Sequence, residues 1–248
     1  MQDNHIHFGE FEEIYYDPVE VLHIVEEKGV TEAAYSSTTS MRKEVKYREV
    51  YIEIKSAISA FSPELFKPYL WYVPSYIYEG LTVKKAFSDF PYKGIKLHPF
   101  ANNWDFSEKE HEHGLHELFA FAQDSCLPVL IHTGPNIVDA PKRFELFFGK
   151  YPETKIILAH CRPVAEAIEI LKKYSNVYGD TAFVPEEWIR LLIENGLGSK
   201  IITGSDFPIT HYSATHYENV DAALFTLKDQ YNADIDMIKK IESMLKMP

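Results

Sequence analysis

Short β-rich runs alternate with longer amphipathic segments along the chain, and this alternation restricts the fold more than any other feature. Each strand-like run is followed by a helix-like stretch, and successive runs start roughly 20 to 40 residues apart, the length of a strand plus a crossover helix. The expected strands lie near residues 2–7, 31–37, 69–74, 93–98, 128–132, 154–160, 176–182 and 200–205. Eight such units predict a (β/α)8 barrel, with residues 1–248 forming a single domain.

The composition of individual runs supports a parallel sheet covered by helices. Pro128–Ile131 and Ile156–Ala159 are apolar without alternation, as strands buried on both faces are. An open doubly wound sheet would show the same pattern. However, no GxGxxG follows the first run and the chain has no P-loop, so the usual phosphate-binding versions of that fold are missing.

Two local patterns predict where helices begin. Asp17 followed by Pro18 supplies an N-cap and a proline at the first helical position. Ser107 followed by Glu110 has the spacing of a capping box.

Composition excludes several classes of protein. The net charge of −12 opposes nucleic acid as a partner, because a polyanion binder needs basic surface. No apolar run is long enough to cross a membrane. Met1–His5 carries no secretory signal, and two cysteines are too few for a disulfide framework, so we expect a cytoplasmic location. A homodimer is compatible with this reading.

Polar side chains stand at the ends of five predicted strands. On a strand, side chains two positions apart point the same way, so His5 and His7 can share one ion, and Lys96 and His98 face together. In a (β/α)8 barrel the carboxyl ends of the strands converge on one mouth. The five segments are His5-Ile6-His7, Gly94-Ile95-Lys96-Leu97-His98-Pro99, Ile131-His132-Thr133-Gly134, Leu158-Ala159-His160-Cys161 and Gly204-Ser205-Asp206-Phe207-Pro208.

A His-x-His pair alone is a weak signal. The chain contains a second pair, His111-Glu112-His113, in a strongly charged stretch that we interpret as a solvated helix face. That stretch is not a zincin helix, because Leu115 stands where the second histidine of HExxH would be. A single buried histidine is also more often structural than a ligand. Position at the strand ends favours a metal site for the first set, because imidazole and carboxylate are suitable ligands for Zn²⁺.

The ordered set HxH, GIKLHP, HTG, LAHC and GSDFP resembles the amidohydrolase superfamily, specifically its amidohydrolase-2 branch, which includes decarboxylases related to aminocarboxymuconate semialdehyde decarboxylase. The resemblance runs from about residue 3 to residue 208. It implies that His5, His7, His132 and Asp206 hold one divalent metal, usually zinc. His160 would sit beside the bound water or the substrate carbonyl.

Further expectations come from comparing this sequence with the branch. The first strand starts almost at Met1, which leaves no room before it for a flanking β-sandwich. Arg162 and Pro163 stand where the family often has glycines, so this loop is either reshaped or supplies a cation for the substrate. Binuclear relatives carry a carboxylated lysine on strand four, at the place of Lys96, together with a second metal. A buried lysine otherwise needs a carboxylate or a substrate anion as partner.

The resemblance leads to a metal-dependent hydrolase that activates water to cleave a C–N or C–O bond of a small molecule. Asp206 would move the proton, and His160 would polarise the scissile carbonyl. Candidate groups for binding the substrate, which could be a carboxylate, are Lys96, His98, Arg162, Arg42 and Arg48. Non-oxidative decarboxylation of an unsaturated or aromatic acid is the alternative, and a non-catalytic metal-binding barrel is the second. Metal-dependent deoxyribonucleases fit less well, because they place a glutamate where this chain has Lys96.

Overall fold

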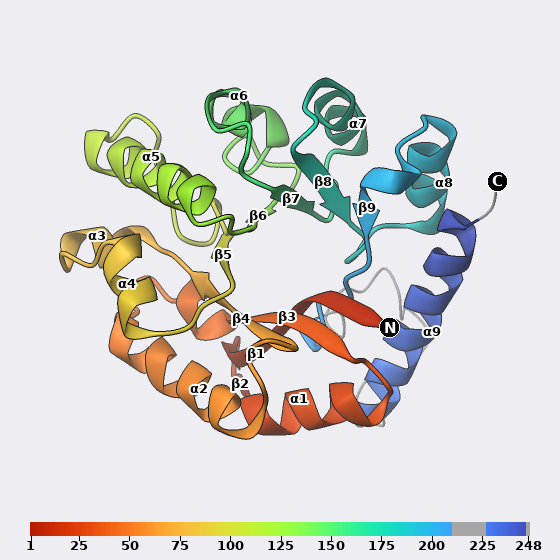
Figure 1. Ribbon diagram of the computed structural model, residues 1–248, viewed down its shortest axis with the longest axis horizontal. Coiled ribbons are helices and arrows are strands. Elements are labelled where there is room, and N and C mark those ends of the chain that lie inside the picture. Colours follow the sequence, from red (N-terminus) through yellow and green to blue (C-terminus); the bar gives the residue numbers. More distant parts are fainter. Residues whose placement is uncertain (210–226, 247–248) are drawn as a thin grey trace.

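The computed structural model describes residues 1–209 and 227–246 (Figure 1). Eight parallel strands form the centre, each pairing with the next along the chain. They are β1 (Gln2–Phe11), β3 (Glu32–Ser37), β4 (Phe66–Trp71), β5 (Gly94–Leu97), β6 (Val129–His132), β7 (Ile156–Ala159), β8 (Val177–Asp180) and β9 (Ile201–Ile202). The short strand β2 (Ile14–Tyr16) pairs with β1 as an antiparallel hairpin.

The last strand returns to the first and closes the ring. The Asn4 amide donates to the carbonyl of Thr203 at 3.0 Å, and the His7 amide donates to that of Phe207 at 2.7 Å. Ile6 and Phe207 form a parallel bridge. These contacts confirm the predicted (β/α)8 barrel, and the described residues include no β-sandwich.

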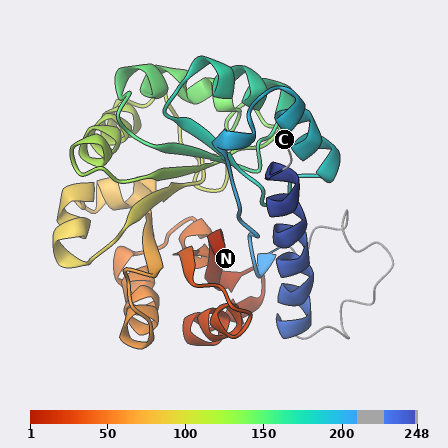
Figure 2. The ribbon, with the colours of Figure 1, turned by 45° about the vertical axis from the view of Figure 1, so that its right-hand side comes forward.

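Helices surround the strands on the outside (Figures 1 and 2). They are α1 (Pro18–Glu27), α2 (Tyr47–Ala60), α3 (Pro74–Tyr78), α4 (Val83–Asp89), α5 (Lys109–Asp124), α6 (Glu145–Lys150), α7 (Val164–Lys173), α8 (Glu186–Glu194) and α9 (Leu227–Leu245), with short 3-10 turns η1 (Thr38–Met41), η2 (Pro141–Phe144) and η3 (Gly198–Lys200). Among the described residues, no helix combines the length and the apolar character that a membrane crossing requires.

The predicted helix starts fared differently. Asp17 caps α1 as expected, accepting from the amides of Val19 and Glu20. The capping box at Ser107 is wrong, because Glu108 is the N-cap residue of α5. The hydroxyl and amide of Ser107 instead donate to Asp105, in a turn that precedes the helix.

Inside the ring, apolar side chains fill the barrel below its mouth. This inner cluster contains Ala34, Tyr69, Leu130, Ile157 and Ala159, with Tyr178 and Ile202 packed against it. Gly94 makes room for it, since a Cβ at that position would lie 2.5 Å from the Tyr69 ring. Three of the polar side chains described next follow members of this layer on the same strands, His132 after Leu130, His160 after Ala159 and Asp180 after Tyr178.

Strand existence was predicted correctly, whereas some boundaries were not. β1 runs to Phe11, beyond the expected end at residue 7, and turns into the hairpin with β2. β4 covers Phe66–Trp71 rather than residues 69–74.

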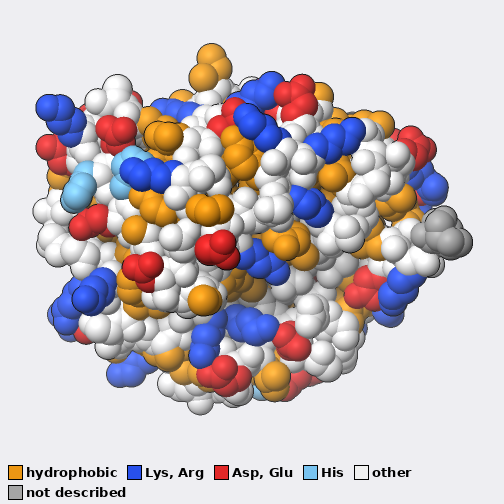
Figure 3. Space-filling view, turned by 45° about the horizontal axis from the view of Figure 1, so that its top comes forward, with side chains coloured by type: hydrophobic (Ala, Val, Ile, Leu, Met, Phe, Trp, Pro, Cys, Tyr) orange, Lys and Arg blue, Asp and Glu red, His pale blue; other side chains and the backbone are white. Residues whose placement is uncertain are grey.

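On the molecular face in Figure 3, described Lys and Arg side chains are interspersed with Asp and Glu, so the negative net charge forms no single-sign patch there.

Candidate active site

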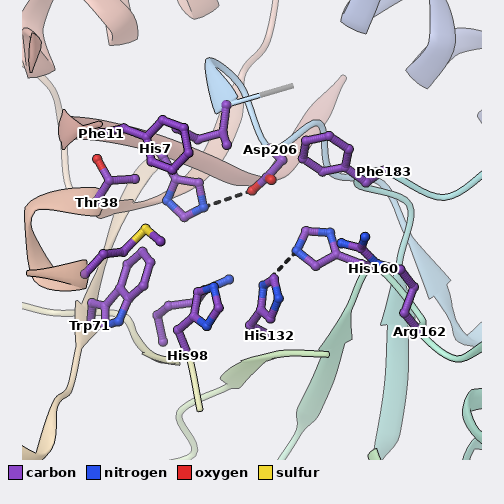
Figure 4. A pocket seen from close by; sticks show the side chains of 13 residues that line it. His7, Phe11, Thr38, Trp71, His98, His132, His160, Arg162, Phe183 and Asp206 are labelled. Atoms are coloured by element: carbon purple, nitrogen blue, oxygen red, sulfur yellow. Dashed lines mark hydrogen bonds and ion pairs between the residues drawn. The ribbon is translucent and has the colours of Figure 1, made fainter. Parts of the chain in front are cut away.

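The mouth of the barrel holds a pocket with a volume of about 210 Å³. Figure 4 shows imidazole rings and the Asp206 carboxylate turned toward its centre, with aromatic side chains around them. The lining residues are His7, Phe11, Thr38, Met41, Trp71, Lys96, His98, His132, His160, Arg162, Phe183, Asp206 and Ile209. Each predicted strand end thus contributes to this pocket, and His5 adjoins it through its contact with His7.

His5, His7 and Asp206 form a compact buried group. The Nε2 atoms of the two imidazoles are 3.0 Å apart. Oδ1 of Asp206 lies 3.0 Å from Nε2 of His5 and 2.9 Å from Nε2 of His7. Burial raises the pKa of Asp206, but the opposing effect of His5 and His7 is larger. The net shift is downward, so the carboxylate stays ionised at neutral pH.

The other nitrogen of each imidazole is held by a neighbouring strand. Nδ1 of His5 lies 2.7 Å from Oδ2 of Asp180, and Nδ1 of His7 lies 3.2 Å from the carbonyl oxygen of Ser36. Because a carboxylate oxygen accepts, Nδ1 of His5 carries the proton and its Nε2 is a lone pair. Nδ1 of His7 faces both the carbonyl oxygen and the hydroxyl of Ser36, each at 3.2 Å. Two imidazole nitrogens and one carboxylate oxygen thus converge on one point. The donor set therefore fits a divalent metal.

Asp180 is a site residue that the sequence reasoning missed. It is fully buried, and its Oδ1 accepts from the backbone amides of His160 at 2.7 Å and Ala182 at 3.2 Å. Burial raises its pKa to about 6. Asp180 also belongs to a second compact group of potential ligands, with His5 and His160. The available signal was its position, because it ends the seventh barrel strand just as other polar residues end theirs.

Lys96 points into the same group from β5. Its Nζ lies 2.9 Å from Nε2 of His5 and 5.6 Å from the centre of the Trp71 ring. Burial lowers the pKa of Lys96 to about 8, although Asp206 and Asp180 oppose the shift. A metal bound by His5 would therefore compete with Lys96 for one lone pair.

His98, His132 and His160 occupy the other side of the pocket. The rings of His98 and His132 are stacked with centres 3.6 Å apart, and Nδ1 of His132 lies 3.1 Å from Nε2 of His160. Nδ1 of His160 donates to the carbonyl of Ala182 at 2.9 Å, and burial lowers the pKa of His160 to about 3. Among the described residues, His132 joins neither compact ligand group.

The sequence of this region decides the family. A family model described as Amidohydrolase matches residues 83–236, more than half of the chain. The matched segment contains β5 to β9 and, with them, four of the polar strand ends.

The chain belongs to the amidohydrolase family.

This membership makes the protein an enzyme, either a hydrolase or a lyase, of a family that depends on metal. No curated protein matches the chain.

Solved structures share the barrel with this amidohydrolase. A probable 2-pyrone-4,6-dicarboxylic acid hydrolase from Acinetobacter baumannii, with citric acid bound, is 14% identical, with a TM-score of 0.61 over 98% of this chain and 94% of that one. A TatD family hydrolase from Entamoeba histolytica is 13% identical, with a TM-score of 0.58 over 98% and 93%. An amidohydrolase II is 14% identical, with a TM-score of 0.52 over 96% and 99%. At these identities the likeness is one of fold.

Arg162 brings a cation to the wall of the amidohydrolase pocket. Its Nε is buried without a hydrogen-bond partner, and its guanidinium carbon lies 5.9 Å from the centre of the Phe183 ring. Burial lowers the pKa of Arg162, against the attraction of Asp206 and Asp180. A guanidinium keeps its charge in such surroundings and suits a carboxylate.

Arg42 was predicted to bind substrate, and the structure gives this prediction no support. Its guanidinium forms ion pairs with Glu10 and Glu49 at the surface, and Arg42 is not among the residues that line the pocket. Arg48 does not line the pocket either. Arginines in such positions are usually bound by neighbouring carboxylates or water.

Proposed function

We propose that this amidohydrolase binds one divalent metal, Zn²⁺ being the expected ion, through His5, His7, His132 and Asp206. The observation that supports this most directly is the convergence of Nε2 of His5, Nε2 of His7 and Oδ1 of Asp206 within 3.0 Å of one another. His132 would complete the set by exchanging its contact with His160 for the metal. A second metal with a carboxylated Lys96 is the less favoured arrangement, because Nζ already has His5 as a partner.

We propose hydrolysis of a C–N or C–O bond as the reaction. When bound, a divalent ion supplies Lewis-acid chemistry and lowers the pKa of water toward neutrality. Asp206 then accepts a proton from the attacking water and passes it to the leaving group. His160 is neutral, and its Nε2 faces the pocket because Nδ1 is tied to a backbone carbonyl. From that position Nε2 accepts a hydrogen bond, for example from the attacking water, and it would donate to the scissile carbonyl oxygen only once it carries a proton.

The walls of the pocket favour a small, flat carboxylate as substrate. Trp71 and Phe183 offer aromatic surfaces, and Arg162 offers an anion a half-buried guanidinium whose Nε has no hydrogen-bond partner. Lys96 and His98 extend the polar side of the pocket. The bound citric acid of the Acinetobacter baumannii hydrolase, a polycarboxylate, agrees with this proposal.

Decarboxylation of an unsaturated or aromatic acid is the second candidate. It is favoured by the same pairing of Arg162 with aromatic walls, which would hold an aromatic acid as readily as a lactone. The ligand residues serve both reactions. The cytoplasmic location, the homodimer and the lack of nucleic-acid binding remain predictions from the sequence.

Two measurements test the proposal. Protein purified without chelator should contain about one divalent metal per subunit, since four ligands suffice for one ion. A panel of small lactones, cyclic amides and aromatic acids should then be assayed in parallel for new carboxylic acid and for CO2. Acid release supports hydrolysis, and CO2 release supports the decarboxylase. Metal-free protein that turns over any of these substrates at the full rate would refute the metal-dependent reaction.

A further inference from the structure

The backbone of Asp206 has a conformation that needs support. Its φ is 67°, in the left-handed region that residues with a side chain rarely adopt. A strained residue persists only where its surroundings hold it in place. Direct contacts do part of this, because the Asp206 amide donates to the carbonyl of His5 at 2.8 Å and the carbonyl of Asp206 accepts from Ile209 at 2.8 Å.

Asp3 supplies further support from beneath the site. It precedes His5 by two positions on β1 and is fully buried. Its Oδ1 accepts from the backbone amides of Ser205 at 3.0 Å and His5 at 3.3 Å. Its Oδ2 accepts from the Ser205 hydroxyl at 2.6 Å, and that hydroxyl accepts from the amide of Phe207 at 3.0 Å. Both chain neighbours of Asp206 are thus tied to one carboxylate.

The helix α9 reaches the same carboxylate from outside the barrel. The hydroxyl of Tyr231 donates to Oδ2 of Asp3 at 2.9 Å, and its ring lies 4.5 Å from that of Phe207. The neighbouring Gln230 donates from Nε2 to the carbonyl of Pro208 at 2.7 Å. Figure 2 shows α9 running alongside the segment that follows β9.

The body of α9 fixes the position of this end of the helix. Ile235, Ile238 and Ile241 are buried along one face. Their spacing of three residues places them on the same side of a helix, where they anchor it to the barrel. Tyr231 and Gln230 are therefore presented to the loop by an element that is itself packed in place.

From these contacts we infer that Tyr231 and Asp3 are positioning residues for Asp206, and that α9 is part of the support of the active site. The inference rests on the proposed role of Asp206 as metal ligand and proton carrier. The phenol fixes the Asp3 carboxylate, the carboxylate fixes Ser205, and Ser205 fixes the turn in which Asp206 is held with its Oδ1 toward His5 and His7. A hydrogen bond to an ionised carboxylate is strong enough for its loss to be felt along this chain.

The test removes a single oxygen atom. Tyr231→Phe keeps the ring against Phe207 and deletes the bond to Asp3. Tyr151→Phe is the matched control, because that buried tyrosine also has a bonded hydroxyl, next to His116 and away from the pocket. Ser205→Ala is a second variant, which removes the hydroxyl that joins Asp3 to the amide of Phe207. It keeps the inference testable if Tyr231→Phe fails to fold.

Two readouts are used on folded protein. Amide hydrogen exchange of the segment 203–209 in metal-free protein should be faster by roughly tenfold in Tyr231→Phe and Ser205→Ala, and unchanged in Tyr151→Phe. The affinity for Zn²⁺, measured by competition with a chromophoric chelator, should be roughly tenfold weaker in the first two variants only. Thermal unfolding of all three variants shows how much each loses in general stability.

The outcomes separate this inference from the proposed function. Unchanged exchange of the segment in both relay variants would overturn it, as would equal effects in Tyr151→Phe. Wild-type protein that fails to bind Zn²⁺ would refute the metal site instead, and the exchange comparison would still decide the role of Tyr231.

Discussion

The two His-x-His pairs of this chain have the same spacing, but the side chains of one pair converge and those of the other diverge. On strand β1, His5 and His7 point the same way and bring their Nε2 atoms within 3.0 Å. On helix α5, a step of two residues turns the side chain about 200°. His111 is consequently buried, bonded to the amide of Asp105 and the hydroxyl of Tyr78, whereas the side chain of His113 is 76% exposed. Whether a His-x-His pair can bind one metal therefore depends on whether it lies on a strand or on a helix.

The largest expected effect comes from removing the strand pair. His5→Ala/His7→Ala should lose the bound divalent metal altogether, because two of the converging ligand atoms disappear. Inductively coupled plasma mass spectrometry of protein purified without chelator gives the metal per subunit. The helix-pair variant, His111→Ala/His113→Ala, is the matched control and should keep the wild-type content. Full occupancy in the strand-pair variant would contradict the assignment.

Asp206→Asn tests the carboxylate that joins the strand pair. We expect kcat to fall by at least about 10²-fold on any substrate found, because an amide cannot carry the proton. Activity must be expressed per bound metal, since occupancy is expected to fall too. Wild-type turnover in this variant would remove Asp206 from the mechanism.

His160→Asn distinguishes a ligand from a neighbour of the metal. With four other ligands proposed, the variant should keep its metal and its thermal stability while kcat falls by roughly 10²-fold. Metal content and a thermal melt are measured on the same sample. Loss of about one metal equivalent would instead make His160 a ligand and favour a binuclear site bridged by Lys96. Unchanged activity would make it a structural histidine.

A smaller effect is expected at Asp180, which holds the first ring of the strand pair. Asp180→Asn leaves one acceptor oxygen for three donors, so His5 is held less firmly. The affinity for Zn²⁺ should weaken about tenfold, a typical effect for a carboxylate behind a metal-bound histidine. Competition with a chelator measures it. Equal affinity in Asp180→Asn and wild-type protein would speak against the role of Asp180.

The smallest effects should separate the members of the helix pair. His111→Ala removes a buried ring with two hydrogen-bond partners and should lower the free energy of unfolding by about 1–3 kcal/mol. His113→Ala changes an exposed side chain and should stay within about 0.5 kcal/mol of the wild type. Urea unfolding measures both. Equal values would mean that the burial of His111 contributes nothing.

The sequence was informative where a single element determines the outcome. The alternation of β-rich runs with amphipathic segments located all eight barrel strands, and the two-residue period of a strand correctly paired His5 with His7 on β1. Local rules failed where tertiary contacts compete with them. The hairpin between β1 and β2 was missed, and Ser107 bonds to Asp105 rather than capping α5. His111 was interpreted as solvated, but it is buried by the neighbouring Tyr78 and Trp104.

The support of the site was harder to predict than its ligands. Asp180 contacts His5 across 175 positions of sequence, and Tyr231 contacts Asp3 across 228. Residues so far apart leave no regular pattern in the sequence that would indicate their contact. A single aspartate at a strand end or a single tyrosine on a helix is also common in any protein. These residues meet because the barrel closes. The segment after β9 pairs with β1, and Asp180 at the end of β8 and Tyr231 on α9 then reach side chains of β1.

The apolar layer formed by Ala34, Tyr69, Leu130 and Ile157 has a kinetic consequence. Because it fills the barrel below the ligands, reactants reach the pocket from the side of the strand ends. An incoming substrate must therefore displace the water that fills this pocket of about 210 Å³. Product leaves the same way. Turnover in such a blind-ended chamber is sequential, and product that lingers competes directly with the next substrate.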